Sequence, residues 1–301
     1  MNITTRIDTI INQAKEKLSP DLLLIILGPT ASGKTKLAVE LARQTDGEII
    51  SADSRQVYRN MDIGTGKDLE EYRGIPHHLI NIKNPGEKYN VDCFRTDFFQ
   101  AYDFIIGQQK RPILCGGSGS YIQTVLQERP YTQIPKNNDL QRELTSLSKA
   151  ELITQIQHIG IPKDFKVDFD NHKRLVRALE ILLYLQHHPE ISHAQRVIDN
   201  YLVFGIKSHL EQQRASITNR LRERLQQGLI EEVENLMKMG VSQTDLIYYG
   251  LEYKYATLYL QGSLTYPEFF SKLNTEIHRY AKRQMTYFRK MEKDGIQINW
   301  L

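Results

Sequence analysis

Residues 22–35 read Leu22-Leu-Leu-Ile-Ile-Leu-Gly-Pro-Thr-Ala-Ser-Gly-Lys-Thr35. The apolar run at 22–27 predicts a short strand that is buried on both faces, as in a parallel sheet. The residues that follow it satisfy the pattern G-x-x-x-x-G-K-[ST], and helical periodicity takes over at 34–44. A buried strand, a glycine-rich loop and a helix in this order predict a phosphate-binding P-loop.

The predicted loop offers several ligands to a phosphate. Its backbone N–H groups converge on phosphate oxygens, and the N-terminus of the following helix adds partial positive charge. Lys34 neutralises the outer phosphate, and the Thr35 hydroxyl is a ligand for Mg²⁺. A nucleoside triphosphate and an isoprenoid diphosphate both present linked phosphates, so the pattern leaves both open. The predicted phosphate-binding residues are Gly28, Thr30, Ala31, Ser32, Gly33, Lys34 and Thr35.

Strand and helix patterns alternate through the first part of the chain. Further strands are predicted at residues 48–51, 78–82 and 112–115, and helices at 91–108 and 120–126. This alternation predicts an α/β fold with a P-loop NTPase-like parallel sheet.

The character of the sequence changes after residue 128. Polar helical sequence follows, strand composition returns at 201–207, and helical pattern continues from 208 to the end. The last long helix is predicted to begin at the capping box Thr265-x-x-Glu268. We therefore predict a core in two parts, 1–127 and 199–301, with a helical C-terminal region. A helical insertion domain at 128–198 interrupts this core.

The composition of the 301 residues excludes several classes of protein. A formal net charge of +3 and 40% hydrophobic residues are typical of a globular protein. Cys93 and Cys115 are too few for a disulfide framework and fit a reducing cytoplasm. Residues 1–18 mix charged and apolar residues at helical spacing, which predicts an amphipathic helix and not a secretory signal, and no membrane span is expected. His77 and His78 are adjacent, so on a strand they point to opposite faces and are not expected to share a metal ion.

Polar residues follow two of the predicted strands, at the end where ligands bind in α/β sheets. Asp53 follows the strand at 48–51, and its carboxylate is suited to act as a general base, a magnesium-orienting group or the acceptor of a substrate hydroxyl. A turn cap is the alternative, structural role. Ser118 follows Gly116 and Gly117, which permit close backbone approach, and its hydroxyl is a hydrogen-bonding group.

Taken in order, these motifs resemble those of the tRNA dimethylallyltransferase (tRNA isopentenyltransferase) family. The resemblance covers about Leu22 to Arg289 and is to the bacterial type, because the zinc-finger tail of eukaryotic members is absent. The matching segments are the P-loop, Asp53-Ser54, Tyr58-Arg59-x-Met61-Asp-Ile-Gly-Thr-Gly-Lys67, Pro76-His-His-Leu79, Gly116-Gly-Ser118, Arg174-Leu-Val-Arg177-Ala-Leu-Glu180 and Ala281-Lys-Arg-Gln284-Met-Thr-Tyr-Phe-Arg289.

The resemblance implies transfer of a dimethylallyl group from dimethylallyl diphosphate to N6 of adenosine-37, adjacent to the anticodon of a tRNA, with release of diphosphate. In this family the P-loop holds the prenyl diphosphate with Mg²⁺, and the helical insertion grips the anticodon stem-loop. By position, Asp53 matches the family's general base, Ser118 a threonine near the reacting centre, and Arg220 an arginine that contacts diphosphate. We expect a monomer.

Basic residues with interleaved aromatics occur in the insertion and in the last helix, as expected of a protein that binds RNA. A net charge of only +3 requires the basic surface to be local. The predicted tRNA-binding residues are Asp53, Ser54, Arg55, Gln56, Lys173, Arg174, Arg177, Arg279, Lys282 and Arg283.

The sequence departs from the family pattern at a few positions. Ser118 replaces a threonine, Lys173 replaces a glutamine and His278 replaces a threonine. Gly250-Leu-Glu-Tyr-Lys254 stands where the family usually has Gly-Tyr and a polar pair. None of these positions lies in the P-loop or at Asp53, so the departures concern contacts with tRNA more than the chemistry.

Three alternative functions are consistent with parts of the sequence. A P-loop kinase of a small metabolite requires an adenine pocket and an arginine-bearing lid, and neither is evident. An isopentenyltransferase acting on free adenine nucleotides would share the P-loop and the Asp53 segment, but the insertion and the basic last helix favour a polymeric acceptor. A tRNA-binding module without catalysis is disfavoured by the intact Lys34, Thr35 and Asp53.

Overall fold

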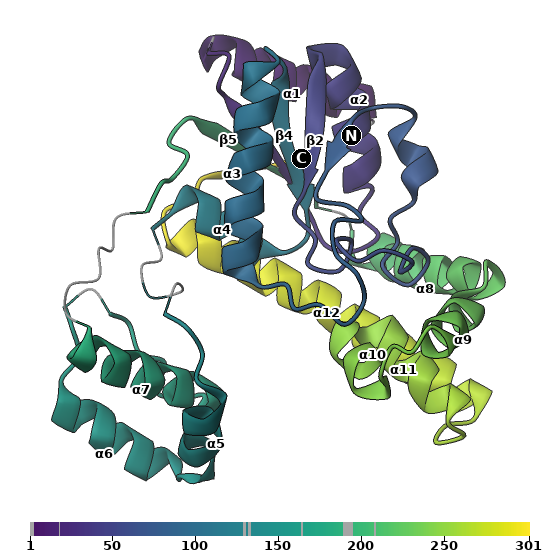
Figure 1. Ribbon diagram of the computed structural model, residues 1–301. Helices are drawn as coiled ribbons and strands as arrows, with labels where there is room; N and C mark the ends of the chain where they lie inside the picture. Colours follow the sequence, from purple (N-terminus) through teal and green to yellow (C-terminus); the bar gives the residue numbers. More distant parts are fainter. Residues whose placement is uncertain are drawn as a thin grey trace. The chain divides into compact units, whose positions relative to one another are not determined.

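The chain divides into two compact units (Figure 1). The sheet unit consists of Met1–Gln127 and Val197–Leu301, and the insertion unit consists of Glu128–Arg196. The sequence-based boundaries of the insertion were 128–198. The computed structural model describes residues 3–17, 19–128, 131, 134–163, 165–188, 195–207 and 209–301.

The sheet unit contains a six-stranded parallel sheet with the strand order β3-β2-β4-β1-β5-β6. This arrangement confirms the predicted α/β fold with a P-loop NTPase-like core. The strands are β1 (Leu23–Leu27), β2 (Gly47–Ser51), β3 (His77–His78), β4 (Arg111–Gly116), β5 (Tyr201–Gly205) and β6 (Ile298–Trp300).

The strand predicted at 78–82 was largely wrong. Strand β3 ends at His78. Leu79 and Asn81 have φ angles of 63° and 58°, which no β-strand accommodates. The segment leaves the sheet because the Asn81 N–H donates to the carbonyl of Gln56, at 3.1 Å, in the loop after β2.

The prediction of helix from residue 208 to the end was also wrong, at the last few residues. Helix α12 (Tyr266–Lys293) ends before Gly295, whose φ of 96° turns the chain. Strand β6 then pairs in parallel with β5. Its Ile298 is buried in the core, so this short segment is held by sheet hydrogen bonds and tertiary packing.

Strand β1 lies inside the sheet and is buried on both faces. Its residues alternate between two apolar clusters: Leu23, Ile25 and Leu27 belong to one, and Leu24 and Ile26 to the other. Alternate residues of a strand point to opposite faces, so each face of the sheet has its own core. Burial of each of these side chains contributes about 1.5–3 kcal/mol to folding.

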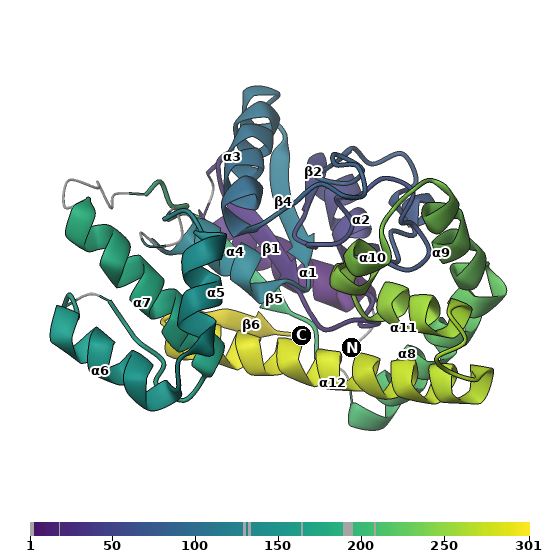
Figure 2. The ribbon, with the colours of Figure 1, turned by 60° about the horizontal axis from the view of Figure 1, so that its bottom comes forward.

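Helices cover both faces of this sheet (Figures 1 and 2). Ile7 and Ile10 of α1 and Leu37 and Leu41 of α2 pack on one face. Phe94 belongs to the apolar cluster of the other face, to which α3, α4 and α12 contribute. The helices of this part are α1 (Ile3–Lys17), α2 (Lys34–Thr45), α3 (Val91–Gly107) and α4 (Gly119–Leu126), and a 3₁₀ helix, η1, spans Leu69–Tyr72.

The C-terminal region is helical and ends in the long helix α12. The predicted capping box is present at its start, where Thr265 and Glu268 exchange hydrogen bonds. Within the described ranges, no helix combines the length and the apolar character needed to cross a membrane. The other helices of this region are α8 (Leu210–Gln226), α9 (Leu229–Lys238), α10 (Gln243–Tyr249) and α11 (Leu251–Leu260).

The insertion unit is a small helical body with its own core. Leu144, Leu152, Ile156, Leu175 and Leu179 form the centre of that core. Side chains cap each helix: Asn137 and Asn171 accept backbone N–H groups, and Ser148 forms a capping box with Glu151. The helices are α5 (Asn138–Ser146), α6 (Lys149–Ile159) and α7 (His172–His187).

Candidate functional site

The P-loop connects β1 to α2, as the sequence predicted. Ala31 and Gly33 have positive φ angles of 59° and 77°, so the loop curls tightly before the first helical residue, Lys34. The Ser32 hydroxyl oxygen is buried and has no hydrogen-bond partner among the described residues. A buried donor without a partner at a helix N-terminus fits a bound anion.

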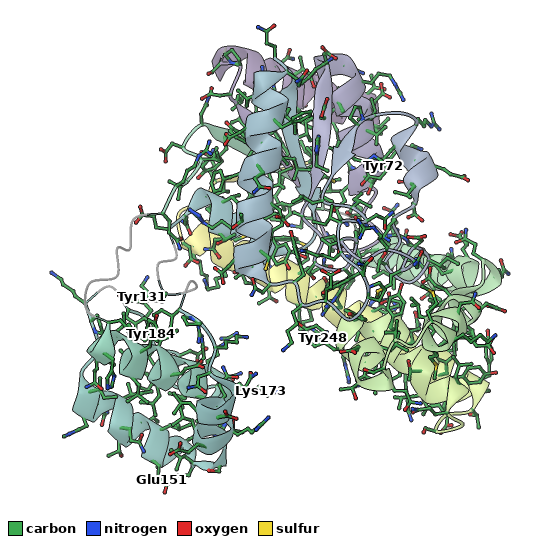
Figure 3. All side chains as sticks on the ribbon, viewed as in Figure 1. Tyr72, Tyr131, Glu151, Lys173, Tyr184 and Tyr248 are labelled. Atoms are coloured by element: carbon green, nitrogen blue, oxygen red, sulfur yellow. The ribbon has the colours of Figure 1, made fainter. Side chains whose placement is uncertain are left out.

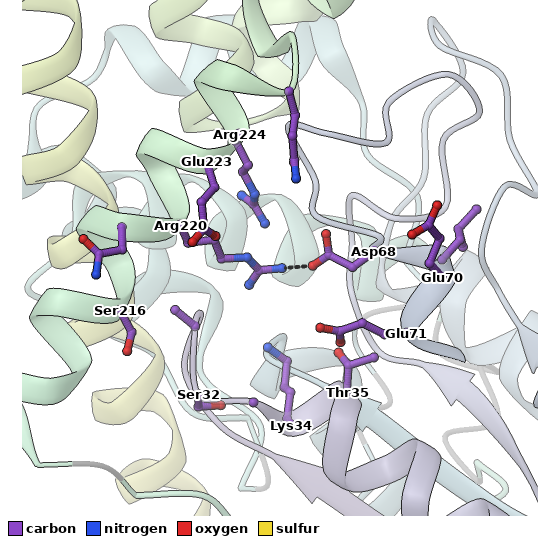
Figure 4. Close-up of a pocket in the computed structure, with 15 residues that line it drawn as sticks. Ser32, Lys34, Thr35, Asp68, Glu70, Glu71, Ser216, Arg220, Glu223 and Arg224 are labelled. Atoms are coloured by element: carbon purple, nitrogen blue, oxygen red, sulfur yellow. Dashed lines mark hydrogen bonds and ion pairs between the residues drawn. The ribbon is translucent and has the colours of Figure 1, made fainter. Parts of the chain in front are cut away.

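A cavity of about 740 Å³ opens over this loop (Figure 4). Lys34 of α2 and Arg220 and Arg224 of α8 line it together with Ser32 and Thr35. Burial lowers the pKa of Lys34, and the positive charges of Arg220 and Arg224 act in the same direction. Bound phosphate would relieve this repulsion, so the cavity is electrostatically suited to an anion.

Carboxylates line the outer part of this cavity. The Asp68 side chain pairs with the Arg220 guanidinium, and Glu70 and Glu71 lie on the same segment (Figure 4). Thr35 faces the cavity beside them. Hard oxygen ligands next to a phosphate-binding loop fit a magnesium ion carried by the phosphate. Sequence analysis missed Asp68, because nothing local distinguishes it from other exposed acidic residues.

A second cavity, of about 290 Å³, adjoins the first and contains Asp53. Lys34, Thr35, Arg220 and Arg224 line both cavities. The anion-binding groups and the predicted base therefore share one continuous site. Its remaining lining includes Ser54, Arg55, Gln56, Gly64, Thr65, Gly66, Tyr249, Leu251, Glu252, Tyr253, Ile277, Tyr280, Arg283 and Gln284.

Asp53 is held by its own turn. Its Oδ1 accepts the N–H of Arg55 at 2.9 Å, which is the capping geometry that the sequence left open. Its Oδ2 has no hydrogen-bond partner among the described residues and is available to a ligand in the cavity. The cap and the catalytic role are therefore compatible, because each uses a different oxygen.

Ser118 lies next to this turn but outside the lining of both cavities. Its hydroxyl accepts the N–H of Ser54 at 3.3 Å, so it fixes the residue after Asp53. The backbone passes very close here, since a Cβ atom on Gly116 would lie 2.2 Å from the Ala52 carbonyl oxygen. A glycine at position 116 is thus required for β2 and β4 to bring the two loops together.

Gln284 fastens α12 to the P-loop. Sequence analysis named it within the family segment 281–289 but not among the site residues. Its Oε1 accepts the N–H of Thr30 at 2.9 Å, and its Nε2 donates to the Gly117 carbonyl at 3.0 Å. It is buried in an otherwise apolar row with Ile277, Ala281 and Phe288. A polar residue inside an apolar stripe is a signal from which a tertiary hydrogen bond could have been inferred.

Arg224 and the partly buried Glu252 form a pair that sequence analysis also missed. Arg224 Nη1 lies 3.4 Å from Glu252 Oε1. Burial raises the pKa of Glu252, although the nearby arginine opposes the shift. Glu252 belongs to the segment 250–254 that departs from the family pattern, and that departure was the only sign of it in the sequence.

The residues predicted to bind tRNA occur in both units. Arg55 and Arg283 line the second cavity. The Arg55 guanidinium lies 5.1 Å from the ring of Tyr248, which is 57% exposed (Figure 3). Arg279 and Arg283 lie near Glu276, at 2.5 and 4.0 Å.

In the insertion unit, two of the three basic residues predicted to bind tRNA have partners within the unit. Arg177 donates to the Ile134 carbonyl and to Glu180, and Arg174 pairs with Asp168. Lys173 is exposed and projects from α7 (Figure 3). Arg177 therefore has a structural role, whereas Lys173 is available at the surface.

The histidine pair lies at the edge of the sheet. His78 Nε2 lies 2.7 Å from a Glu48 carboxylate oxygen, and the His77 ring packs against Tyr72 with centroids 4.5 Å apart. Each ring thus has a different protein partner.

Comparison with known proteins identifies the family. The model of the IPP transferase family matches residues 56–291, and that of the isopentenyl transferase family matches residues 21–78. The tRNA dimethylallyltransferase 2 of Phocaeicola vulgatus is 48% identical over 283 residues, which cover 93% of this chain and 92% of the relative. The crystal structure of the tRNA isopentenylpyrophosphate transferase of Bacillus halodurans has a TM-score of 0.68 at 32% identity and covers 93% of this chain and 89% of its own. A eukaryotic dimethylallyltransferase acting on tRNA shares the fold, with a TM-score of 0.71 at 23% identity over 92% of this chain and 73% of its own. The chain therefore belongs to the tRNA dimethylallyltransferase family.

Proposed function

We propose that the protein transfers the dimethylallyl group of dimethylallyl diphosphate to N6 of adenosine-37 in a tRNA and releases diphosphate. The observation that carries this proposal is the continuous site in which Lys34 and Arg220 adjoin the free carboxylate oxygen of Asp53. The cationic end suits the diphosphate, and the carboxylate end suits the amine that attacks it. Membership of the family agrees with this assignment.

The diphosphate would be bound by the P-loop. Backbone N–H groups, the Ser32 hydroxyl and Lys34 surround the place where phosphates bind at the start of α2. Thr35 would hold Mg²⁺, and Asp68 and Glu71, which line the same cavity, would orient its water ligands. When bound, the metal ion stabilises the negative charge that develops on the leaving diphosphate. Arg220 would leave Asp68 and contribute to the same stabilisation.

Asp53 would act as the general base. Adenine N6 is a weak nucleophile, so its proton has to be removed as the new N–C bond forms. The N6–C1 bond forms as the C1–O bond of the donor breaks, the proton passes to Asp53 Oδ2, and the bonding electrons leave with diphosphate. Ser118 would hold the Asp53 turn in place through Ser54. The target base has to leave the anticodon stack to reach this cavity.

The part of the tRNA that the protein binds would be the anticodon stem-loop. The insertion at 128–198 would grip it through surface residues such as Lys173, and Arg55 and Arg283 would contact nucleotides beside the target base. The remaining residues of this proposed surface are Asp53, Ser54, Gln56, Arg174, Arg177, Arg279 and Lys282. We further propose that the enzyme is a cytoplasmic monomer.

The test is transfer of label from dimethylallyl diphosphate with Mg²⁺. The acceptors are unmodified tRNA with consecutive adenosines in its anticodon loop and, separately, AMP; ATP is offered as a competing substrate. Label in tRNA but not in AMP is the expected result. Label only in AMP would assign the acceptor to free nucleotides. ATP turnover without prenyl transfer would replace the proposal with a small-molecule kinase.

A further inference from the structure

A short loop forms one wall of the cavity that contains Asp53. We call residues 61–67 the wall loop, and its Gly64, Thr65 and Gly66 line the cavity. Two of its carbonyl groups face the arginines of α8: Gly66 O accepts from Arg220 Nη2 and Gly64 O from Arg224 Nη1, each at 3.4 Å. The loop therefore contacts both guanidinium groups.

Glu232 of α9 holds the wall loop from behind. Its carboxylate accepts the N–H groups of Asp62, Ile63 and Gly64 at 2.7, 2.7 and 2.9 Å. Three successive N–H groups around one carboxylate form an anion-binding nest. Tyr253 of α11 donates its hydroxyl to the same carboxylate at 2.7 Å. One charged side chain thus satisfies four donors on two segments.

The wall loop lies in close contact with its neighbours. A Cβ atom on Gly64 would lie 2.6 Å from the ring of Tyr253, and one on Gly66 would lie 1.7 Å from Arg224 Nη2. The loop is therefore packed between the tyrosine on one side and the arginines on the other. A movement of the loop that Glu232 holds is transmitted to Arg220 and Arg224 by direct contact.

We propose that Glu232 is a positioning residue for the diphosphate site, which it serves by fixing the two carbonyl groups that orient Arg220 and Arg224. The inference rests on the proposed function, in which Arg220 binds the diphosphate. Glu232 lines neither the cavity over the P-loop nor the cavity of Asp53, so it acts through the wall loop and Tyr253, which do line the second cavity.

The test is the variant Glu232→Gln, measured by calorimetry with inorganic pyrophosphate and Mg²⁺ and by steady-state kinetics. The amide keeps the size of the side chain, but its NH₂ group faces backbone N–H donors and cannot accept from them. The Kd for pyrophosphate and the KM for the prenyl donor are expected to rise roughly 10- to 100-fold, the effect of losing an outer partner of a binding group. The KM for tRNA is expected to stay within about twofold, because the arginines of the donor site act on diphosphate.

Two further variants separate positioning from stability. Glu234→Gln on the same helix removes only an exposed pair with Lys238 at 3.3 Å and is expected to leave both constants unchanged. Tyr253→Phe keeps the Glu232 carboxylate and its three backbone bonds, so it is expected to raise the Kd for pyrophosphate in the same direction by a few-fold only.

The outcomes decide the inference. A lower Tm for Glu232→Gln with an unchanged Kd for pyrophosphate and an unchanged donor KM would show a merely structural role and overturn it. If Glu232→Gln does not fold, an unchanged Kd in Tyr253→Phe overturns it equally. A wild-type protein that binds pyrophosphate but transfers no prenyl group would refute the proposed function while leaving the weakened binding of the variant as support for the positioning role. A wild-type protein that binds no pyrophosphate would refute the donor site and the inference together.

Discussion

The sheet unit and the insertion unit use their charged residues in different ways. In the sheet unit, the ion pair of Arg220 with Asp68 joins residues that are 152 positions apart. Arg220 also lines the second cavity together with Asp53. In the insertion unit, Arg177 pairs with Glu180 three positions away, and Arg174 with Asp168 six positions away. The first pattern assembles a site from distant segments, whereas the second stabilises a small helical body locally.

This difference indicates where chemistry and recognition are located. Buried charges that converge on a cavity interact strongly with a ligand, because little water screens them. Exposed charges such as Lys173 would contribute to affinity for a polyanion but not to bond formation. Substitutions in the sheet unit should therefore change turnover, and those in the insertion unit should change stability or tRNA affinity.

The largest expected effect is that of Asp53→Asn. The asparagine keeps an Oδ1 atom for the N–H of Arg55, so the turn is preserved while the base is removed. The kcat should fall by about 10²- to 10⁴-fold, the usual contribution of a general base. The Kd for tRNA should stay unchanged in a filter-binding assay. Near-native turnover would refute the assignment of the base.

Lys34→Ala should come next in size. The variant removes the cation that would face the diphosphate, and kcat/KM for the prenyl donor should fall by about 10²- to 10³-fold. Lys36→Ala is the matched control, because Lys36 is exposed on the same helix and lines neither the P-loop cavity nor that of Asp53. Equal losses in the two variants would mean that general electrostatic attraction, and not the P-loop site, binds the donor.

Glu180→Gln should destabilise the insertion unit without changing the chemistry. Burial would raise the pKa of Glu180, but hydrogen bonds from Arg177, Gln141 and the N–H of Asn137 outweigh it and hold the pKa below its usual value of 4.5. A carboxylate whose pKa is lowered by folding stabilises the fold above the unfolded-state pKa, and this stability is lost as pH falls through the lower folded-state value. The substitution should cost about 1–3 kcal/mol at neutral pH.

Hydrogen exchange of α7 amides as a function of pH measures this effect. Protection in the wild-type protein should decline below about pH 4.5, the unfolded-state pKa. In the Glu180→Gln variant, the α7 amides should be less protected at neutral pH, and their protection should decline less as the pH is lowered. Identical pH profiles would show that Glu180 does not stabilise the unit. A lower kcat of Glu180→Gln at neutral pH would contradict the prediction that substitutions in the insertion unit leave turnover unchanged.

The smallest effects should come from single surface lysines. Lys173→Ala and Lys282→Ala should each weaken tRNA binding a few-fold and reduce the slope of log K against log salt by about one. Lys238→Ala, at an exposed position of α9, is the control and should change neither quantity. Salt-independent affinity in the wild-type protein would contradict the proposed RNA surface.

Much of the architecture follows from local patterns. The apolar run before Gly28, the P-loop and the strand–helix alternation predicted the parallel sheet and the anion site, because strand burial and phosphate binding depend on neighbouring residues. Asp53 was identified for the same reason, since it follows a strand at the ligand-binding edge. The length of the strand predicted at 78–82 was too great, because an apolar pattern does not reveal the positive φ angles at Leu79 and Asn81.

The sequence by itself determined the class of fold, the phosphate loop, the candidate base and, through resemblance, the family. Only the tertiary structure decided which side chains hold these parts together. Gln284 meets Thr30 across 254 positions, and Glu232 meets Asp62 across 170. Such partners cannot be inferred from local spacing, because a hydrogen bond between distant segments is fixed by how the helices pack on the sheet and not by the periodicity of either segment.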